Sequence, residues 1–322
     1  MISMCIPVDH AALADAIGRC AGLAVLLEVS AYPKPGNVHR LADFQETRYE
    51  HFLASALSIS SFMREAAARG IQVAINKLDL NKVGCGQIIR DTISDVLTWQ
   101  KGGNTSLGTT ILLTPLSIAG GMTATTGMMK LETLRQNLGR VIQATTPQDA
   151  VHLYEAINLA KPGGLGKAKK FDATDPASKA EILRLGVTLF DIFKMAADYD
   201  DVAKEWVTNY SVTFELGYPF FRKVLEQTGD LNVATVHVFL RILSENPDTL
   251  IARKVGLEKA REVTLKAREA LAEGGLMTEK GKKLVNELDQ KLRTPDHRFN
   301  PGTTADLTAS TLMVALLDGL RP

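Results

Sequence analysis

The sequence predicts an all-α protein, a single globular helical bundle over residues 1–322 with functional loops at helix starts. Alternating strand patterns rich in β-branched residues are nearly absent. Aromatic residues make up only 6% of the chain, whereas Ala and Leu, which favour helices, are abundant. No long Ser-, Pro- or Gly-rich linker and no repeat of fixed period divides the chain, so we expect one domain.

The composition excludes several classes of protein. Hydrophobic residues make up 45% of the chain and the net charge is +1, which favours neither a nucleic-acid partner nor a membrane surface. The three cysteines, Cys5, Cys20 and Cys85, show no CxxC spacing and fit a reducing cytoplasm. The N-terminus lacks the pattern of a signal peptide. The longest apolar run, 109–119, is too short to span a bilayer.

The first half of the chain shows apolar residues at helical spacing in five stretches and an almost wholly apolar run in a sixth. Gly70 stands where a helix would stop, and Pro147 suits a first helical turn. The apolar run must be central to the fold. The predicted helices cover residues 10–29, 48–69, 87–99, 131–144 and 147–159, with the apolar helix beginning at 109.

The second half predicts further helices between residues 178 and 271. Turn-forming residues predict breaks at 217–219, 229–230 and 246–248. A charged helix over 277–292 and an apolar helix over 307–317 complete the chain.

The loop after the first helix has a rigid backbone and a polar sequence. Pro33 and Pro35 fix two φ angles, so Lys34 lies on a stiff extended segment, and Asn37 and His39 follow a glycine corner. Such loops aim polar groups at anionic ligands. An ordinary interhelical loop is the simpler interpretation.

Three later loops end in the first turn of a helix, where unpaired N–H groups and the helix dipole favour phosphate. Asn104 or Thr105 is the expected N-cap in the first of these loops, and Asp248 or Thr249 in the second. The third, over 300–306, resembles a capping box in which Asp306 replaces Glu. Simple capping explains each loop alone, but the recurrence favours a phosphate-rich ligand.

Other motifs leave two interpretations open. The stretch 161–167 is Gly- and Lys-rich but lacks the strand and the Lys-Ser/Thr ending of a Walker motif. Its alternatives are an anion site and a basic solvent loop. The carboxylates of 198–201 with Glu205 could hold Mg²⁺ or simply begin a helix. Arg253 suits bidentate phosphate contact, and His237 suits a buried core position.

Four sequence islands, in the same order, resemble the triphosphoribosyl-dephospho-CoA synthase family. They are Glu28-Val-x-x-x-Pro-Lys-Pro-Gly-x-Val, Asn104-Thr105-x-x-Gly108, Asp248-Thr249 with the following Leu and Arg, and Asn300-Pro-Gly-x-x-Ala-Asp-Leu. They cover about a quarter of the chain. The family pattern has Asp at the position of His39, His-Lys at Ser106-Leu107 and Gly-Gly at Lys254-Val255, so the chain resembles a divergent branch whose substrates can differ.

The resemblance implies an all-α fold and a reaction of ATP with 3′-dephospho-CoA, in which the acceptor's 2′-hydroxyl attacks the ATP ribose at C1′ and adenine leaves. It implies nucleotide substrates and Mg²⁺, and it leaves homo-oligomerisation open. Such a reaction needs an acid, a base and a clamp on the triphosphate. Alternatives are transfer to another acceptor and a non-catalytic nucleotide-binding protein.

We assign candidate roles on this basis. Glu50, Asp248 and Asp306 are the candidate catalytic residues, and Glu50 and Asp248 the candidate metal ligands. The candidate substrate- and phosphate-binding residues are Lys34, Asn37, His39, Asn104, Thr105, Thr249 and Arg253. We expect Lys34, Glu50, Asn104, Asp248 and Asp306 to surround one polar pocket. If capping were the whole explanation, each would bond only to its own helix.

Overall fold

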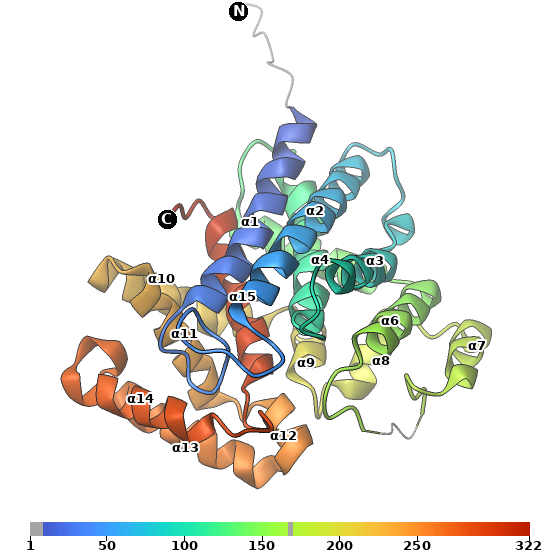
Figure 1. Ribbon diagram of the computed structural model, residues 1–322. Coiled ribbons are helices and arrows are strands. Elements are labelled where there is room, and N and C mark those ends of the chain that lie inside the picture. The colour runs from blue at the N-terminus through green and yellow to red at the C-terminus, as the bar shows by residue number, and fades with distance from the viewer. Residues whose placement is uncertain (1–8, 167–169) are drawn as a thin grey trace, which may run out of the picture.

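The computed structural model describes residues 9–166 and 170–322, and among these the chain is helical, without a strand (Figure 1). The helices that form the first half are α1 His10–Ser30, α2 Tyr49–Ala74, α3 Cys85–Trp99, α4 Leu107–Ala124, α5 Leu131–Gln143, α6 Pro147–Ala160, α7 Pro176–Leu185 and α8 Leu189–Ala196. Those of the second half are α9 Asp201–Val207, α10 Tyr218–Thr228, α11 Leu231–Glu245, α12 Thr249–Val255, α13 Leu257–Ala272, α14 Glu279–Leu292 and α15 Gly302–Leu317. The all-α prediction is confirmed; the single domain stays a prediction.

The central element is α4, in which every residue except Gly108 is buried. It packs against α1, α2, α5 and α15, and the apolar side chains of these helices form the main hydrophobic core (Figure 1). Among the helices described, α4 is the one long and apolar enough to cross a membrane. Its burial inside the protein accounts for that apolar composition.

Two glycines let α2 and α4 cross in close contact. A Cβ atom on Gly70 would lie 2.0 Å from the carbonyl oxygen of Ile118, and one on Gly121 would lie 2.0 Å from that of Ala67. The prediction that Gly70 ends its helix is therefore wrong. The helix continues for another turn, because this glycine serves a contact between two backbones.

A second apolar cluster lies among α11, α12, α13 and α14, and includes Phe239, Ile251 and Leu288. The helices of this cluster follow α10 in the chain and lie below it in Figure 1. The loop over residues 31–48 lies between this cluster and the main core. Ala31 belongs to the cluster, whereas Val38 and Phe44 pack with Val29 in a small group of their own. The loop thus joins the two halves of the molecule.

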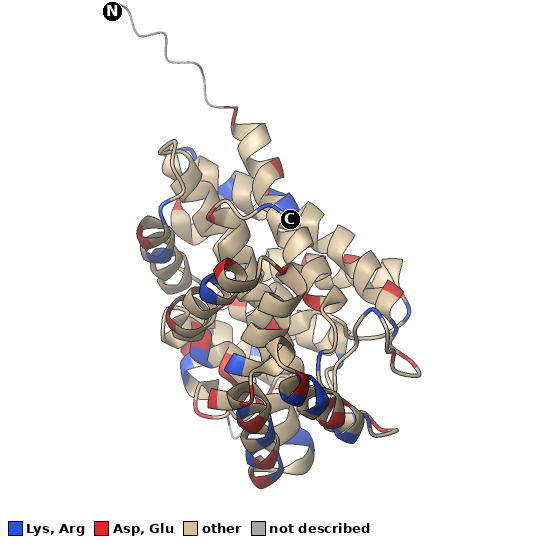
Figure 2. Cartoon of the chain, turned by 90° about the vertical axis from the view of Figure 1, so that its left-hand side faces the viewer, with Lys and Arg blue, Asp and Glu red and all other residues tan. Residues whose placement is uncertain are grey.

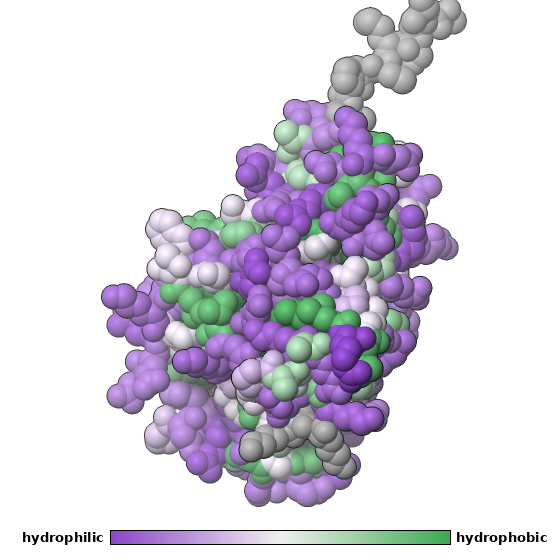
Figure 3. All heavy atoms as spheres, turned by 90° about the vertical axis from the view of Figure 1, so that its right-hand side faces the viewer, coloured by the Kyte–Doolittle hydropathy of each residue, from purple (hydrophilic) through white to green (hydrophobic). Residues whose placement is uncertain are grey.

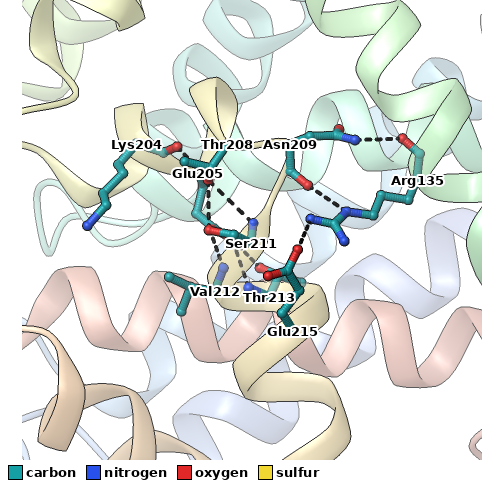
Figure 4. Close-up of polar contacts among 9 residues, drawn as sticks. All are labelled: Arg135, Lys204, Glu205, Thr208, Asn209, Ser211, Val212, Thr213 and Glu215. Atoms are coloured by element: carbon teal, nitrogen blue, oxygen red, sulfur yellow. Dashed lines mark hydrogen bonds and ion pairs between the residues drawn. The ribbon is translucent and has the colours of Figure 1, made fainter.

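The predicted break at 217–219 is also wrong, because a π-helix, η2 Val212–Gly217, runs directly into α10. The carboxylate of Glu205, fully buried on α9, accepts hydrogen bonds from the backbone N–H groups of Val212 (2.8 Å) and Thr213 (2.9 Å). It also accepts one from the Thr213 hydroxyl at 2.6 Å (Figure 4). Burial raises the pKa of Glu205 to about 7. A carboxylate at the start of η2 thus satisfies its unpaired donors.

The surface carries both signs of charge. Figure 2, viewed from the side of α10 and α14 in Figure 1, shows Lys and Arg interspersed with Asp and Glu. Figure 3, viewed from the side of α7 and α8, shows apolar patches among hydrophilic side chains. Leu183, Leu185 and Met195, on these two helices, are large exposed apolar residues. Homo-oligomerisation stays a prediction.

Candidate functional site

A buried ion pair lies where α1 ends. The ammonium of Lys34, with no exposed surface, contacts the carboxylate of Glu28 and donates a hydrogen bond to the Glu28 carbonyl at 2.9 Å. Burial raises the pKa of Glu28 and lowers that of Lys34, and each partner opposes the shift of the other. The proline-rich loop therefore folds back so that its lysine closes the C-terminal end of α1.

The same loop is held by α14. The backbone N–H of Gly36 donates to Asp289 at 2.9 Å, and the imidazole of His39 lies 3.4 Å from the other Asp289 oxygen. Arg293 binds Asp289 at 3.0 Å and donates to the carbonyl of Asn37 at 2.7 Å. Burial lowers the pKa of His39, while Asp289 opposes that shift. His39 is thus a buried partner of Asp289.

Asp306, on the first turns of α15, lies against the start of α4. The Thr109 hydroxyl donates to its Oδ1 at 2.5 Å, and a Cβ on Gly108 would lie 2.0 Å from its Oδ2. Burial raises the pKa of Asp306 from 3.8 to about 7, the hydrogen bonds from Thr109 oppose this, and the charges of Glu28 and Asp248 add to it. A carboxylate that titrates near neutral pH can accept or release a proton during a reaction.

Asp248 joins two helix starts. Its Oδ1 accepts hydrogen bonds from the N–H groups of Leu250 (2.9 Å) and Ile251 (3.1 Å) and so caps α12. Its Oδ2 accepts from the N–H (2.7 Å) and the hydroxyl (2.8 Å) of Thr304 on α15. The side chain is 1% exposed. Asp248 is therefore a buried connection between α12 and α15.

Thr249 and Arg253 connect α12 to neighbouring elements. The Thr249 hydroxyl donates to Thr303 at 3.2 Å, and the Arg253 guanidinium binds Asp200 at 2.5 Å. Burial raises the pKa of Asp201, the first residue of α9, to about 6. The start of α9 therefore lies beside the start of α12, and the charges of Lys204 and Arg253 both act on Asp201.

Glu50, Asn104 and Thr105 lie at the starts of α2 and α4. Glu50 is exposed and pairs with Arg48. Asn104 is also exposed and accepts a hydrogen bond from the N–H of Leu107 at 3.1 Å. Thr105 shares a hydrogen bond of 2.7 Å with Ser55 of α2. The N-cap of α4 is Ser106, so the expectation of Asn104 or Thr105 at that position is off by one or two residues.

The predicted residues therefore fall into two groups. Lys34, Asp248 and Asp306 act on one another electrostatically, since the charge of Asp306 raises the pKa of Lys34 and that of Asp248 raises the pKa of Asp306. Asn37 lies beside them, its side chain 3.5 Å from the Pro301 carbonyl. Glu50 and Asn104 are exposed residues of the neighbouring helix starts. Asp248 bonds to α15 as well as to its own helix α12, and Asp306 bonds to Thr109 of α4, so simple capping does not account for either. The capping box expected over 300–306 is wrong, because the N-cap of α15 is Pro301, which forms no side-chain capping hydrogen bond.

Neither Glu50 nor Asp248 has the surroundings of a ready-made magnesium ligand. Asp248 already accepts four hydrogen bonds, and Glu50 is paired with Arg48. Within residues 9–166 and 170–322, no three His, Cys, Asp or Glu side chains are arranged to hold a metal ion. Mg²⁺ keeps several waters and is often bound through substrate phosphates. The expectation that Glu50 and Asp248 bind Mg²⁺ stays a prediction.

Several residues that contact Lys34, Asp306 and the loop over 31–48 are not among the candidates from the sequence. Glu28 closes on Lys34, Thr109 donates to Asp306, and Asp289 with Arg293 holds the loop. Glu28 and Gly108 stand inside the sequence islands, so a signal for them existed. Asp289 lies in a charged helix whose pattern predicts only solvent exposure, and Arg293 directly follows that helix. The Gly-rich stretch reaches α12, because a Cβ on Gly164 would lie 3.3 Å from that of Arg253, whereas its last residue, Lys167, lies outside the described residues.

The chain is similar to known proteins in sequence and in fold. Residues 14–322 match the family of ATP:dephospho-CoA triphosphoribosyl transferases. The 2-(5″-triphosphoribosyl)-3′-dephosphocoenzyme-A synthase of Klebsiella pneumoniae is 31% identical over 93 residues, which are 29% of this chain and 30% of that protein. The probable synthase of Vibrio cholerae serotype O1 is 23% identical over 308 residues, 92% of this chain and 87% of that protein.

A crystal structure also shares the fold. It is that of an Archaeoglobus fulgidus protein described as a triphosphoribosyl-dephospho-CoA synthase, and it superposes with a TM-score of 0.59 at 26% identity. The superposition covers 84% of this chain and all of that one.

Proposed function

Because the chain belongs to the ATP:dephospho-CoA triphosphoribosyl transferase family, we propose that it transfers the triphosphoribosyl group of ATP to the 2′-hydroxyl of 3′-dephospho-CoA. The bond between ribose C1′ and adenine breaks, and a bond between C1′ and the acceptor oxygen forms. The acceptor hydroxyl loses a proton and adenine leaves with one. The residues around Asp306 are suited to this exchange.

The observation that carries the proposal is the position and pKa of Asp306. A base for a hydroxyl works best when its pKa lies near the operating pH, and burial has raised the pKa of Asp306 to about 7. The Thr109 hydroxyl donates to one of its oxygens, while Gly108 leaves room for the other. We assign Asp306 the role of general base toward the acceptor hydroxyl.

The surrounding charges set the state of that base. The buried Glu28–Lys34 pair acts on Asp306 from the end of α1, and Asp248 acts on it from the start of α12. A negative charge near Asp306 raises its pKa, and a nearby ammonium lowers it. Glu28, Lys34 and Asp248 thus tune the proton affinity of Asp306. Asp248 also holds the start of α15, the helix on which Asp306 lies.

Arg253 is our choice for the phosphate clamp. Its guanidinium is partly exposed and held by Asp200, so a triphosphate can reach it. Arginine binds phosphate oxygens in a bidentate manner and keeps its charge at every relevant pH. Asn104 and Thr105 at the start of α4, and Glu50 at the start of α2, are exposed or half-buried and remain candidates for orienting the nucleotide.

One observation supports a different acceptor as the alternative. His39 stands where the family pattern has Asp, and the structure buries it against Asp289. Ser106 and Leu107 replace a His-Lys pair at the start of α4 and are both buried. Since charged groups that would contact an acceptor are absent at these positions, transfer to another hydroxyl is the alternative function.

The test is release of free adenine from ATP, measured by chromatography with and without 3′-dephospho-CoA. We expect release that depends on the acceptor and is lost in Asp306→Asn, which keeps the shape of the side chain but cannot take a proton. Release only with other hydroxyl compounds would select the second function. No release with any acceptor, but with stabilisation by ATP, would leave a non-catalytic nucleotide-binding protein.

A further inference from the structure

A surface cleft of about 390 Å³ lies between α10, α11 and α13, and none of the site residues named above lines it. Its walls are mainly apolar and include Phe220 and Leu271. Its volume falls within the range of small-molecule sites in proteins, about 300–1,000 Å³. The family reaction as proposed above makes no use of this cleft.

Three cationic side chains line the cleft, namely Lys223, Arg241 and Arg268, against one carboxylate, Glu245. Glu245 pairs with Arg241 at 3.3 Å. Among the described residues, neither Lys223 nor Arg268 has an acidic partner within 4 Å. The cleft therefore has an excess of positive charge, which favours a negatively charged occupant.

His237 adds a buried donor to this cleft. The side chain is 1% exposed, and its Nε2 accepts a hydrogen bond from the backbone N–H of Leu276 at 2.9 Å. Burial lowers the pKa of His237 to about 4, so the ring is neutral near pH 7. In a neutral imidazole whose Nε2 accepts, the proton resides on Nδ1. That Nδ1–H is buried and has no acceptor among the described residues.

Arg241 shows the same feature. Its guanidinium stacks over the ring of Phe220 at 5.6 Å, and its Nε–H is buried without an acceptor in the described chain. A buried donor without a partner is unfavourable, because nothing compensates the loss of its hydrogen bonds to water. Two such donors lining one cationic cleft are the arrangement expected where an oxyanion supplies the acceptors.

We propose that this cleft binds a small organic oxyanion, either a carboxylate or a phosphate ester, that carries an apolar body. Its oxygens accept from His237 Nδ1 and Arg241 Nε, and Lys223 and Arg268 add positive charge. Its apolar body lies against Phe220 and Leu271. The site is separate from the one that contains Asp306.

The experiment is a calorimetric titration of the full chain with benzoate and with phenyl phosphate, and benzyl alcohol is the uncharged control. We expect both anions to bind saturably, and benzyl alcohol at least about tenfold more weakly, a difference of about 1.4 kcal/mol. The stronger of the two anions identifies the oxyanion class. The NMR signal of the His237 Nδ1 proton should shift on binding.

Two variants locate the site. Arg241→Gln should weaken binding at least about tenfold, as loss of a charge-assisted hydrogen bond would. Lys223→Gln, an exposed position on α10, should weaken it less and tests the cleft even if Arg241→Gln fails to fold. Lys266→Gln, exposed on α13 and paired with Glu269, is the matched control and should bind like the wild type.

Three results would overturn the proposal. The first is no saturable binding of either anion at about 10 mM, far above the Kd of a specific site. The second is binding that neither Arg241→Gln nor Lys223→Gln weakens. The third is displacement of the anion by ATP in simple competition, which would place it in the nucleotide site.

Discussion

Replacing Asp248 by alanine should loosen two helices at once. Its carboxylate accepts two hydrogen bonds at the start of α12 and two from Thr304 at the start of α15. Alanine leaves all four donors without a partner in a place where the side chain is 1% exposed. The predicted effect is therefore larger than that of an ordinary N-cap substitution.

The magnitude follows from the contacts. Loss of the N-cap of α12 costs about 1 kcal/mol. Each Thr304 donor left buried and unpaired costs about 1–3 kcal/mol. Burial raises the pKa of Asp248, so ionisation of this carboxylate is unfavourable in the folded state. Its removal therefore offsets part of the loss in the free energy of unfolding. We expect Asp248→Ala to lower the free energy of unfolding by about 2–4 kcal/mol, a large share of the total stability of a domain.

Urea unfolding, followed by the helical circular dichroism signal, measures this value. A double-mutant cycle with Thr304→Val separates the α15 half of the interaction, because valine removes the hydroxyl and keeps the shape. We expect a coupling of about 1 kcal/mol between the two residues. Asp248→Asn retains an acceptor and should lose less than Asp248→Ala. A loss below about 1 kcal/mol for Asp248→Ala, within the range of a single cap, would refute the two-helix connection.

Four further predictions concern the proposed site. Adenine release should rise as the pH passes about 7, where Asp306 ionises, and the rise should be absent in Asp306→Asn. Because its folded pKa is raised, Asp306 binds a proton in the folded state that the unfolded chain releases, so its contribution to stability falls between pH 3.8 and about 7. Asp306→Asn should therefore gain stability relative to the wild type across that window, and unfolding curves with no such trend would contradict the raised pKa. Gly108→Ala places a Cβ 2.0 Å from Asp306 and should reduce adenine release at least about tenfold. The same clash should lower the free energy of unfolding by about 1–3 kcal/mol. Gly166→Ala, with nothing within 4 Å, is its control, and equal activity of the two variants would speak against a role for the contact. Arg253→Gln should raise the KM for ATP while changing the free energy of unfolding by less than about 1 kcal/mol, because its pair with Asp200 is partly exposed; an unchanged KM would exclude Arg253 from the clamp.

Helix positions followed from the sequence because apolar spacing is a local property. The helix predicted over 10–29 is α1, and that over 147–159 is α6, each within one residue. The errors at Gly70 and Gly217 have a common origin. The local pattern predicts stops at Gly70 and Gly217, yet Gly70 contacts the Ile118 carbonyl and a Cβ on Gly217 would lie 2.3 Å from the Thr311 hydroxyl. Contacts with distant residues are not visible in a local pattern.

In the candidate site, too, local features follow from the sequence and long-range contacts do not. The polar character of the loops around Lys34, Asp248 and Asp306 was evident from residue types and helix-start chemistry. Their partners were not, since Asp306 meets Thr109 across 197 positions and Gly36 meets Asp289 across 253. Nor could the sequence show that Glu50 is exposed and paired with Arg48. Burial and long-range pairing decide which carboxylate has an unusual pKa, and both require the fold.

The glycine crossing of α2 and α4 works as a spacer for the site. At Gly70 and Gly121 the two backbones are in contact, so no side chain lies between the helices that could change its conformation to adjust their distance. The start of α2 carries Glu50, and the start of α4 carries the Thr109 contact to Asp306. A methyl group added at Gly70 would push these two ends apart, although it lies turns away from either. Since a misplacement of about 1 Å can cost about a hundredfold in rate, the tolerance of the proposed reaction is set partly at this crossing.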